Sequence, residues 1–235
     1  EYSIPDSLET DYFEGQFSFL KSEGHWEEQI SFYPLLLKAF PSTIPRVLKA
    51  IKAFKSAELY LAGIYGMLKV FEETPKFVAN FTLLRPYLFN LEEHFELDSL
   101  LVPACRLYTY LLKNITGNTK FSGIVVGVKT EIVTFLKKFT SIESVFGEDE
   151  DLFASLSTVW DLCGCLVEEP HLQEEEPYFL FSFVLKLYTF IEKVPPNDRR
   201  ETVSRFASLM ALMVKDCMEL IADLDCIYQE FVLKI

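Results

Sequence analysis

Residues 121–139 carry the feature that most constrains the fold, an apolar stripe with the period of an α-helix. The segment reads "FSGIVVGVKTEIVTFLKKF". Its apolar positions recur in steps of three and four residues at Phe121, Val125, Val128, Ile132, Phe135 or Leu136, and Phe139. We interpret its charged residues as lying off this stripe, at Lys129, Glu131, Lys137 and Lys138. Such a stripe, sustained over about five turns, predicts an amphipathic helix with one buried face.

The same periodicity predicts helices along most of the chain. The sequence has only 9 Gly and 11 Pro in 235 residues, which leaves long stretches without a breaker. The predicted helices are Thr10–Lys21, Trp26–Ala39, Thr43–Phe54, Ala57–Phe71, Pro75–Phe89, Leu97–Ile115, Phe121–Phe139, Glu150–Leu166, Pro177–Val194 and Asp198–Leu233. The last is too long for one globular helix, so we expect a break near Asp216. No stretch alternates long enough to predict a strand, and the predicted fold class is all-α.

Two acidic segments interrupt this pattern, near residues 147–151 and 168–176. Like charges at this density resist packing, so we expect both segments to be solvated, mobile loops. Hydrophobic helices of the same kind resume directly after each segment, which argues against interdomain linkers. We therefore predict a single all-helical domain over residues 1–235.

Similar aliphatic–Tyr pairs recur along the chain and suggest a repeat. They occur in "IYGMLKVFEETP", "LYTYLLKNITGN" and "LYTFIEKVPPND", at Tyr65, Tyr108 and Tyr188. The first two tyrosines lie about 40 residues apart, which is in the range of armadillo and HEAT units. Tyr188 does not continue this period, so the array need not be regular.

The stretch "YLLKNITGN" resembles the third helix of an armadillo repeat. In that helix an aromatic residue is followed four positions later by Asn and then by a small-residue cap; here these are Tyr110 and Asn114. The resemblance implies a right-handed superhelical array of armadillo/HEAT-like repeats, with Tyr110 and Asn114 in a concave, partner-binding groove. At Trp160 the corresponding Asn position holds Gly164, which departs from the family pattern. Two alternatives stay open: an irregular all-α domain with chance tyrosine pairs, and an Asn114 that caps its own helix.

A second candidate binding element is the basic segment "RVLKAIKAFK", residues 46–55. Its cations are Arg46, Lys49, Lys52 and Lys55, in a chain of net charge −13. We expect the apolar residues of the segment to be buried, at Val47, Leu48, Ile51 and Phe54. The cations then form either an ordinary solvated face or a docking helix for an acidic protein segment or an anionic membrane.

Several other kinds of chemistry are disfavoured. The net charge of −13 argues against nucleic-acid binding, which needs a concentrated basic surface. Cys163 and Cys165 with His171 invite a metal interpretation, but two thiols two residues apart face different sides of a helix. No nucleophile elbow, phosphate-binding glycine loop or dinucleotide motif occurs. We therefore expect no catalytic residues, no metal and no cofactor.

The cysteine pattern and the absence of long apolar runs bear on location. The five cysteines are an odd, scattered set, which is typical of reduced intracellular thiols in the cytoplasm or nucleus. No apolar run approaches the length of a membrane span.

We expect a non-catalytic scaffold or adaptor that binds a partner protein, or a peptide segment of one. Binding would use the concave groove or the basic segment. The alternative function is a compact helical domain that binds lipid or another hydrophobic ligand in an aromatic-lined pocket. The sequence leaves the identity of the partner and the oligomeric state open.

Overall fold

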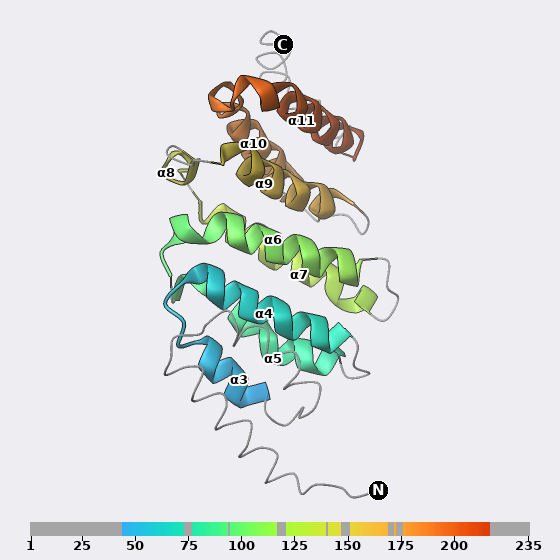
Figure 1. The fold of residues 1–235 in the computed structure, drawn as a ribbon. Coiled ribbons are helices and arrows are strands. Elements are labelled where there is room, and N and C mark those ends of the chain that lie inside the picture. Colours follow the sequence, from blue (N-terminus) through green and yellow to red (C-terminus); the bar gives the residue numbers. More distant parts are fainter. Residues whose placement is uncertain are drawn as a thin grey trace, which may run out of the picture. The chain divides into compact units, whose positions relative to one another are not determined.

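The computed structural model describes residues 44–72, 77–93, 95–116, 121–139, 141–146, 151–168, 172 and 176–216. Within these ranges the regular structure is entirely helical, which confirms the predicted all-α class (Figure 1). The helices are α3 (Ile44–Ile51), α4 (Ala57–Glu72), α5 (Phe77–Phe89), η2 (Leu91–Glu93), α6 (Leu97–Ile115), α7 (Ser122–Lys137), α8 (Glu143–Phe146), α9 (Leu152–Val167), α10 (Glu176–Tyr188), η4 (Ile191–Lys193) and α11 (Pro196–Asp216).

Some predicted elements fall outside the described residues. They are the helices Thr10–Lys21 and Trp26–Ala39, the part of the last predicted helix beyond Asp216, and most of the two acidic segments. The chain divides into two compact units, Glu1–Leu107 and Tyr108–Ile235, and the division falls within α6. The single domain over residues 1–235 stays a prediction.

In the first unit, α4 packs against both α3 and α5 (Figure 1). The approach of α3 to α4 depends on Gly63, because a Cβ atom there would lie 3.1 Å from Cγ1 of Ile51. Tyr60 of α4 is fully buried, and its ring meets the ring of Phe95 edge-on at 5.2 Å. Its hydroxyl donates a hydrogen bond to the carbonyl of Tyr87 near the end of α5, at 3.0 Å.

The helix in the basic segment is shorter than the predicted Thr43–Phe54. It ends at Ile51, and the N–H of Phe54 then bonds to the carbonyl of Ile51 at 3.1 Å in a tight turn. The four apolar residues of the segment are all buried, as predicted: Val47, Leu48, Ile51 and Phe54. The Phe54 ring is thus buried because the chain folds back in a tight turn after Ile51, and not because the helix continues to Phe54.

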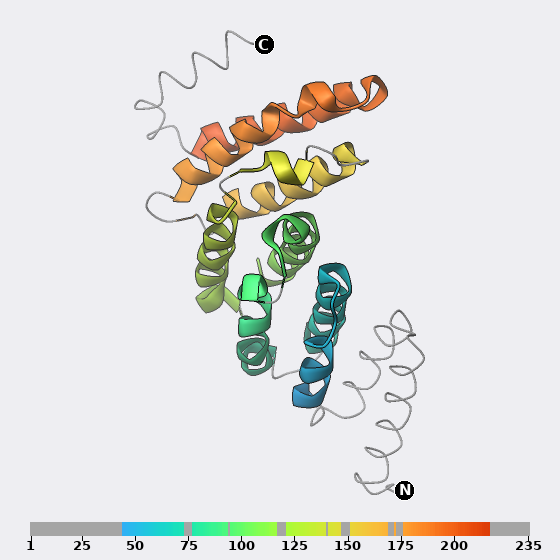
Figure 2. The same ribbon diagram turned by 90° about the vertical axis from the view of Figure 1, so that its left-hand side faces the viewer.

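In the second unit, α9 packs against α10 and α11, and α10 also packs against α7 (Figures 1 and 2). Aromatic side chains fill part of this interior. The ring of Phe206 lies 5.9 Å from that of Trp160 and 4.9 Å from that of Tyr188. Trp160 is buried, and its indole N–H has no hydrogen-bond acceptor among the described residues.

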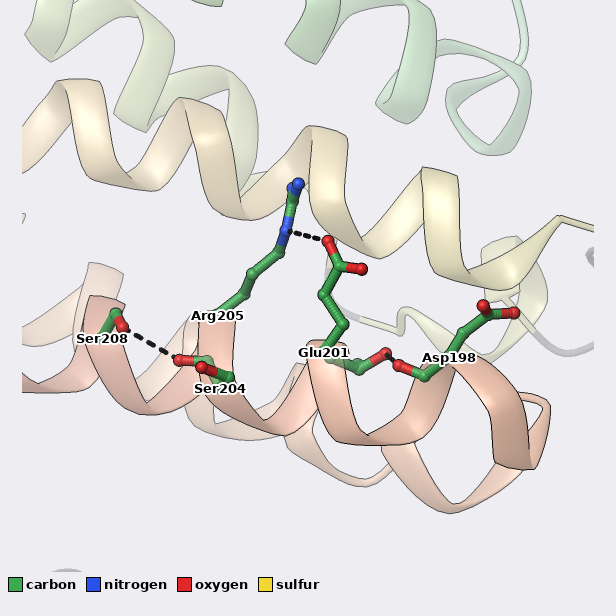
Figure 3. Close-up of polar contacts among 6 residues, drawn as sticks. Asp198, Glu201, Ser204, Arg205 and Ser208 are labelled. Atoms are coloured by element: carbon green, nitrogen blue, oxygen red, sulfur yellow. Dashed lines mark hydrogen bonds and ion pairs between the residues drawn. The ribbon is translucent and has the colours of Figure 1, made fainter.

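Polar side chains along α11 bond within their own helix (Figure 3). The Nε of Arg205 lies 3.2 Å from Oε1 of Glu201, and the hydroxyl of Ser208 donates to the carbonyl of Ser204 at 2.9 Å. The guanidinium of Arg205 also lies 5.8 Å from the ring centroid of Phe153 in α9. These contacts occupy side chains that would otherwise be available on the surface of α11.

The apolar stripe of residues 121–139 is buried as predicted, with one correction. Lys129, which we expected off the stripe, is 0% exposed. Its position is four residues after Val125 and three before Ile132, so the helical spacing itself places Lys129 on the buried face. The charge of the residue led us to assign it to the wrong side of the helix.

Helix boundaries are otherwise close to expectation. The bounds of α6, Leu97–Ile115, match the prediction at both ends, and Pro103 lies inside this helix without ending it. The helix α10 ends at Tyr188, whereas we predicted helix to Val194; the short η4 follows it. The four-residue α8 was not predicted, because one turn with a single buried residue, Phe146, has no periodicity to detect.

Candidate partner-binding surface

The basic segment presents its lysines to solvent on both sides of the end of α3. Lys49 lies on α3, whereas Lys52 and Lys55 follow the end of the helix, and all three side chains are exposed. Arg46 lies in α3, but its side chain is outside the described part of the chain. The predicted single helix that carries all four cations is therefore replaced by a group of exposed lysines around the end of α3.

One of these lysines contacts an aromatic ring of α5. The ammonium of Lys52 lies 5.0 Å from the ring centroid of Tyr87, which is half-buried. A cation over a tyrosine face is attracted by the negative potential of the ring. This contact joins the basic segment to the outer face of α5, where Leu83 is 52% exposed.

The position of Tyr87 is fixed from inside the unit. The hydroxyl of Tyr60 donates to its main-chain carbonyl, which is one of the last carbonyls of α5 and has no helical donor. Burial raises the pKa of the Tyr60 phenol well above its usual range, and Tyr87 and Glu93 add to this effect. Tyr60 therefore stays protonated and keeps donating at any ordinary pH.

Tyr110 and Asn114 belong to the second unit, and both are half-buried in α6. The side-chain amide of Asn114 donates to the carbonyl of Tyr110 in the same helix, at 2.9 Å. Leu107, Leu111 and Leu112 are buried, as expected for a helix with this face turned inward. The amide NH2 of Asn114 thus bonds within its own helix, but it reaches a carbonyl one turn before the helix end and not one of the last four carbonyls that a cap would satisfy.

No protein-family profile, curated protein or solved structure matches the chain. The armadillo/HEAT resemblance of Tyr110 and Asn114, and their role in partner binding, stay predictions.

The described cysteines are all buried: Cys105, Cys163 and Cys165. Burial raises the pKa of Cys163 far above its usual range. The pKa of Cys165 is also raised, first by burial and then by Glu168. A buried neutral thiol is a poor nucleophile and a poor metal ligand.

Within the described ranges, no group of three or more His, Cys, Asp or Glu side chains is arranged to hold a metal ion. The histidines His25, His94 and His171 lie outside these ranges, as do Cys217 and Cys226. None of the described helices combines the length and the apolar character needed to cross a membrane.

Lys129 is the residue that sequence reasoning missed. Its ammonium donates to the main-chain carbonyls of Leu166, at 3.0 Å, and of Glu168. Both carbonyls lie at the C-terminal end of α9, where the helix has a partial negative charge and lacks backbone donors. Lys129 therefore ties α7 to the end of α9 from within the core. Its side chain is fully enclosed, so we assign it a structural role.

Proposed function

We propose that the protein is a non-catalytic scaffold that binds a partner protein through its basic segment, residues 46–55. The exposure of Lys49, Lys52 and Lys55 carries this proposal, because the apolar residues between them already supply the packing against the core. Three exposed cations in a chain of net charge −13 form a local reversal of charge. Such a reversal favours contact with an acidic protein segment and speeds its association.

The proposed architecture is an irregular right-handed array of armadillo/HEAT-like repeats. Packing in each unit supports it, because α4 contacts its sequence neighbours α3 and α5, and α10 contacts α9 and α11. Local packing of this kind is typical of repeat proteins. A strict repeat is not favoured, since Tyr108 is fully buried whereas Tyr65 is half-buried. The unpaired thiols of Cys163 and Cys165 support a location in the cytoplasm or nucleus.

A charge-reversal experiment tests the proposed function. The test variant combines Lys49→Glu, Lys52→Glu and Lys55→Glu. The control combines Lys137→Glu, Lys186→Glu and Lys193→Glu, which change the net charge equally at exposed positions of the second unit. Tagged proteins are crosslinked in cells, and the captured proteins are quantified by mass spectrometry after washing at low and high salt.

The proposal predicts partners that are captured by the wild type and the control but lost from the test variant. Capture by the wild type should weaken as salt rises, because exposed charges are screened. Helical circular dichroism should be the same for all three proteins, since exposed charges contribute little to stability. Equal capture by both variants across the salt range contradicts the proposal.

A further inference from the structure

We infer that the outer face of α5, beside the basic segment, anchors an acidic partner segment through one large apolar side chain. We call this site the α5 anchor and define it as Leu83, Pro86 and Tyr87 together with Lys52. The inference rests on the proposed function and names the chemistry of the partner. It places the apolar contact on α5 and the charged contacts on the lysines around the end of α3.

Helical spacing brings the three α5 residues of the anchor together. Pro86 and Tyr87 follow Leu83 by three and four positions, so the three side chains lie on one face of the helix. Leu83 is 52% exposed, Pro86 is exposed and Tyr87 is half-buried. The opposite face of α5 is committed to the core through Phe81, Leu84 and Leu88, which are all buried. Among the described residues, the exposed apolar side chains of the anchor therefore lie on the face of α5 opposite its buried residues.

Lys52 adds a fixed charge at the edge of this apolar face. Its ammonium lies 5.0 Å from the Tyr87 ring, which holds the cation next to the anchor. The hydrogen bond from Tyr60 to the Tyr87 carbonyl, at 3.0 Å, fixes the backbone that carries the ring. Preorganised groups lose less conformational entropy on binding than free side chains. Lys49 and Lys55, three positions before and after Lys52 in the sequence, are also exposed, and we include them in the positive rim of the proposed site.

An apolar centre with a positive rim selects its ligand by two criteria. Carboxylates of a partner segment would pair with the lysines, which steers association and sets the register. A large apolar side chain of the same segment would cover Leu83 and Pro86, and central apolar contacts of this kind supply most of the binding energy of interfaces. The two criteria together describe an acidic segment that contains a residue such as Leu, Ile, Met or Phe.

A second exposed apolar residue shows why Leu83 is singled out. Val203 of α11 is 44% exposed, so exposure alone does not distinguish the two. The exposed neighbours of Val203 at helical spacing are Arg199, Arg200 and Ala207, and the aromatic residue at this spacing, Phe206, is buried. Isolated apolar residues are normal on protein surfaces and need no explanation. Leu83 differs because a proline, an aromatic ring and a ring-bound cation adjoin it.

The test uses a random library of short peptides displayed on phage and selected on the intact protein. Selected peptides are synthesised, and their dissociation constants are measured by fluorescence polarisation. The variants Leu83→Ser and Lys52→Glu remove the apolar and the charged parts of the anchor. Each has a matched control in the second unit: Val203→Ser at an exposed apolar position, and Lys137→Glu at a lysine whose ammonium lies 5.6 Å from the ring centroid of Phe179.

The inference predicts that enriched peptides contain several acidic residues and one large apolar residue. Leu83→Ser and Lys52→Glu should each weaken their binding at least about tenfold, whereas the two controls should not. Lys52→Arg should keep binding, because it preserves both the charge and the contact with the ring. Melting temperatures should be unchanged in the Leu83 and Val203 variants, since these side chains are exposed.

Three results overturn the inference, and they are distinct from failure of the proposed function. If the selected acidic peptides bind Leu83→Ser as tightly as the wild type, Leu83 is not an anchor. The basic segment then remains a binding site. If no acidic peptide is selected, the inference of the α5 anchor is contradicted as a whole. The crosslinking experiment then tests the proposed function independently. Binding to phosphatidylserine vesicles without peptide binding assigns the lysines to a membrane surface instead.

Discussion

The ends of α5 and α9 present the same structural problem, and the two units solve it differently. Each helix ends with main-chain carbonyls that lack helical donors. At the end of α5 the donor is the hydroxyl of Tyr60, and at the end of α9 it is the ammonium of Lys129. Both side chains reach across from a neighbouring helix, and both are fully buried.

The two donors differ in their charge and in the number of hydrogen bonds that they can donate. A tyrosine hydroxyl donates one hydrogen bond, whereas an ammonium carries three donors and a full positive charge. Lys129 uses this capacity on the carbonyls of Leu166 and Glu168. Burial of a charge costs several kcal/mol in principle and requires good polar partners. The end of α9 should therefore depend more strongly on its donor than the end of α5.

The largest expected effect is at Lys129. We predict that Lys129→Ala lowers the free energy of unfolding by about 3–5 kcal/mol, because it opens a cavity and removes the donor from the two carbonyls of α9. Urea denaturation followed by circular dichroism measures this change. Lys129→Met should lose less than Lys129→Ala, since it keeps the volume of the side chain without burying a charge.

Lys137→Ala is the matched control for this prediction, because it removes an exposed lysine from the same helix. It should change the free energy of unfolding by no more than about 0.5 kcal/mol. A loss of less than about 1 kcal/mol in Lys129→Ala would show that the end of α9 does not depend on this donor.

An intermediate effect is expected at Tyr60. Tyr60→Phe removes only the hydroxyl and leaves the Tyr87 carbonyl without this donor, so we predict a loss of about 1–3 kcal/mol. Thermal and urea unfolding at neutral pH measure it. If Tyr60→Phe proves more destabilising than Lys129→Ala, the neutral donor is the more important of the two and the comparison is reversed.

The contribution of Tyr60 to the free energy of unfolding should depend on pH. The folded-state pKa of Tyr60 is raised from its ordinary value of 10.0, so the unfolded chain ionises first as the pH rises. The stabilisation is therefore complete below pH of about 10 and is lost progressively above it. Wild-type stability should fall more steeply than that of Tyr60→Phe between about pH 9 and 11. Cys163 and Cys165 are present in both proteins, so their contribution cancels in the difference.

The smallest effect is expected where a side chain serves a carbonyl of its own helix near the surface. Asn114 is half-buried and donates to Tyr110 within α6. We predict that Asn114→Ala costs about 0.5–1 kcal/mol, because water can replace the lost bond. Leu111→Ala, one turn earlier and fully buried, should cost about 2–5 kcal/mol.

Asn114→Ala also separates the two interpretations of this residue. Lost affinity for a captured partner with an unchanged melting temperature would support the groove implied by the armadillo resemblance. A lowered melting temperature with unchanged affinity would leave Asn114 as a residue that stabilises its own helix.

The sequence predicted helices well because their signal is local. Apolar residues in steps of three and four define α6 from Leu97 to Ile115 at both ends. The error at Lys129 has a specific origin: its spacing from Val125 and Ile132 indicates a buried position, but we gave its charge more weight than its spacing. A buried lysine becomes reasonable only when the carbonyls that surround it are known, and these come from α9.

The candidate site could be predicted only in part, for the same reason. The burial of Ile51 and Phe54 follows from the apolar pattern of the basic segment, and so does the exposure of Lys49. The contact of Lys52 with Tyr87 joins two segments that no local pattern connects. The proposed anchor on α5 depends on that contact, which places a cation over Tyr87, one helical turn from Leu83.

The close approach of Ile51 to Gly63 has a consequence for genetics. A methyl group there would come within 3.1 Å of Ile51, the last residue of α3, and would force that side chain to move. Ala at this position needs only a small shift of the Ile51 side chain, whereas a larger residue would displace the backbone of Ile51 and with it Lys52, the next residue in the chain. A screen for alleles that lose partner binding should therefore recover bulky apolar substitutions of Gly63 alongside substitutions of the lysines. Such an allele would leave the net charge and the exposed residues of the proposed site unchanged, because Gly63 is buried beneath that site.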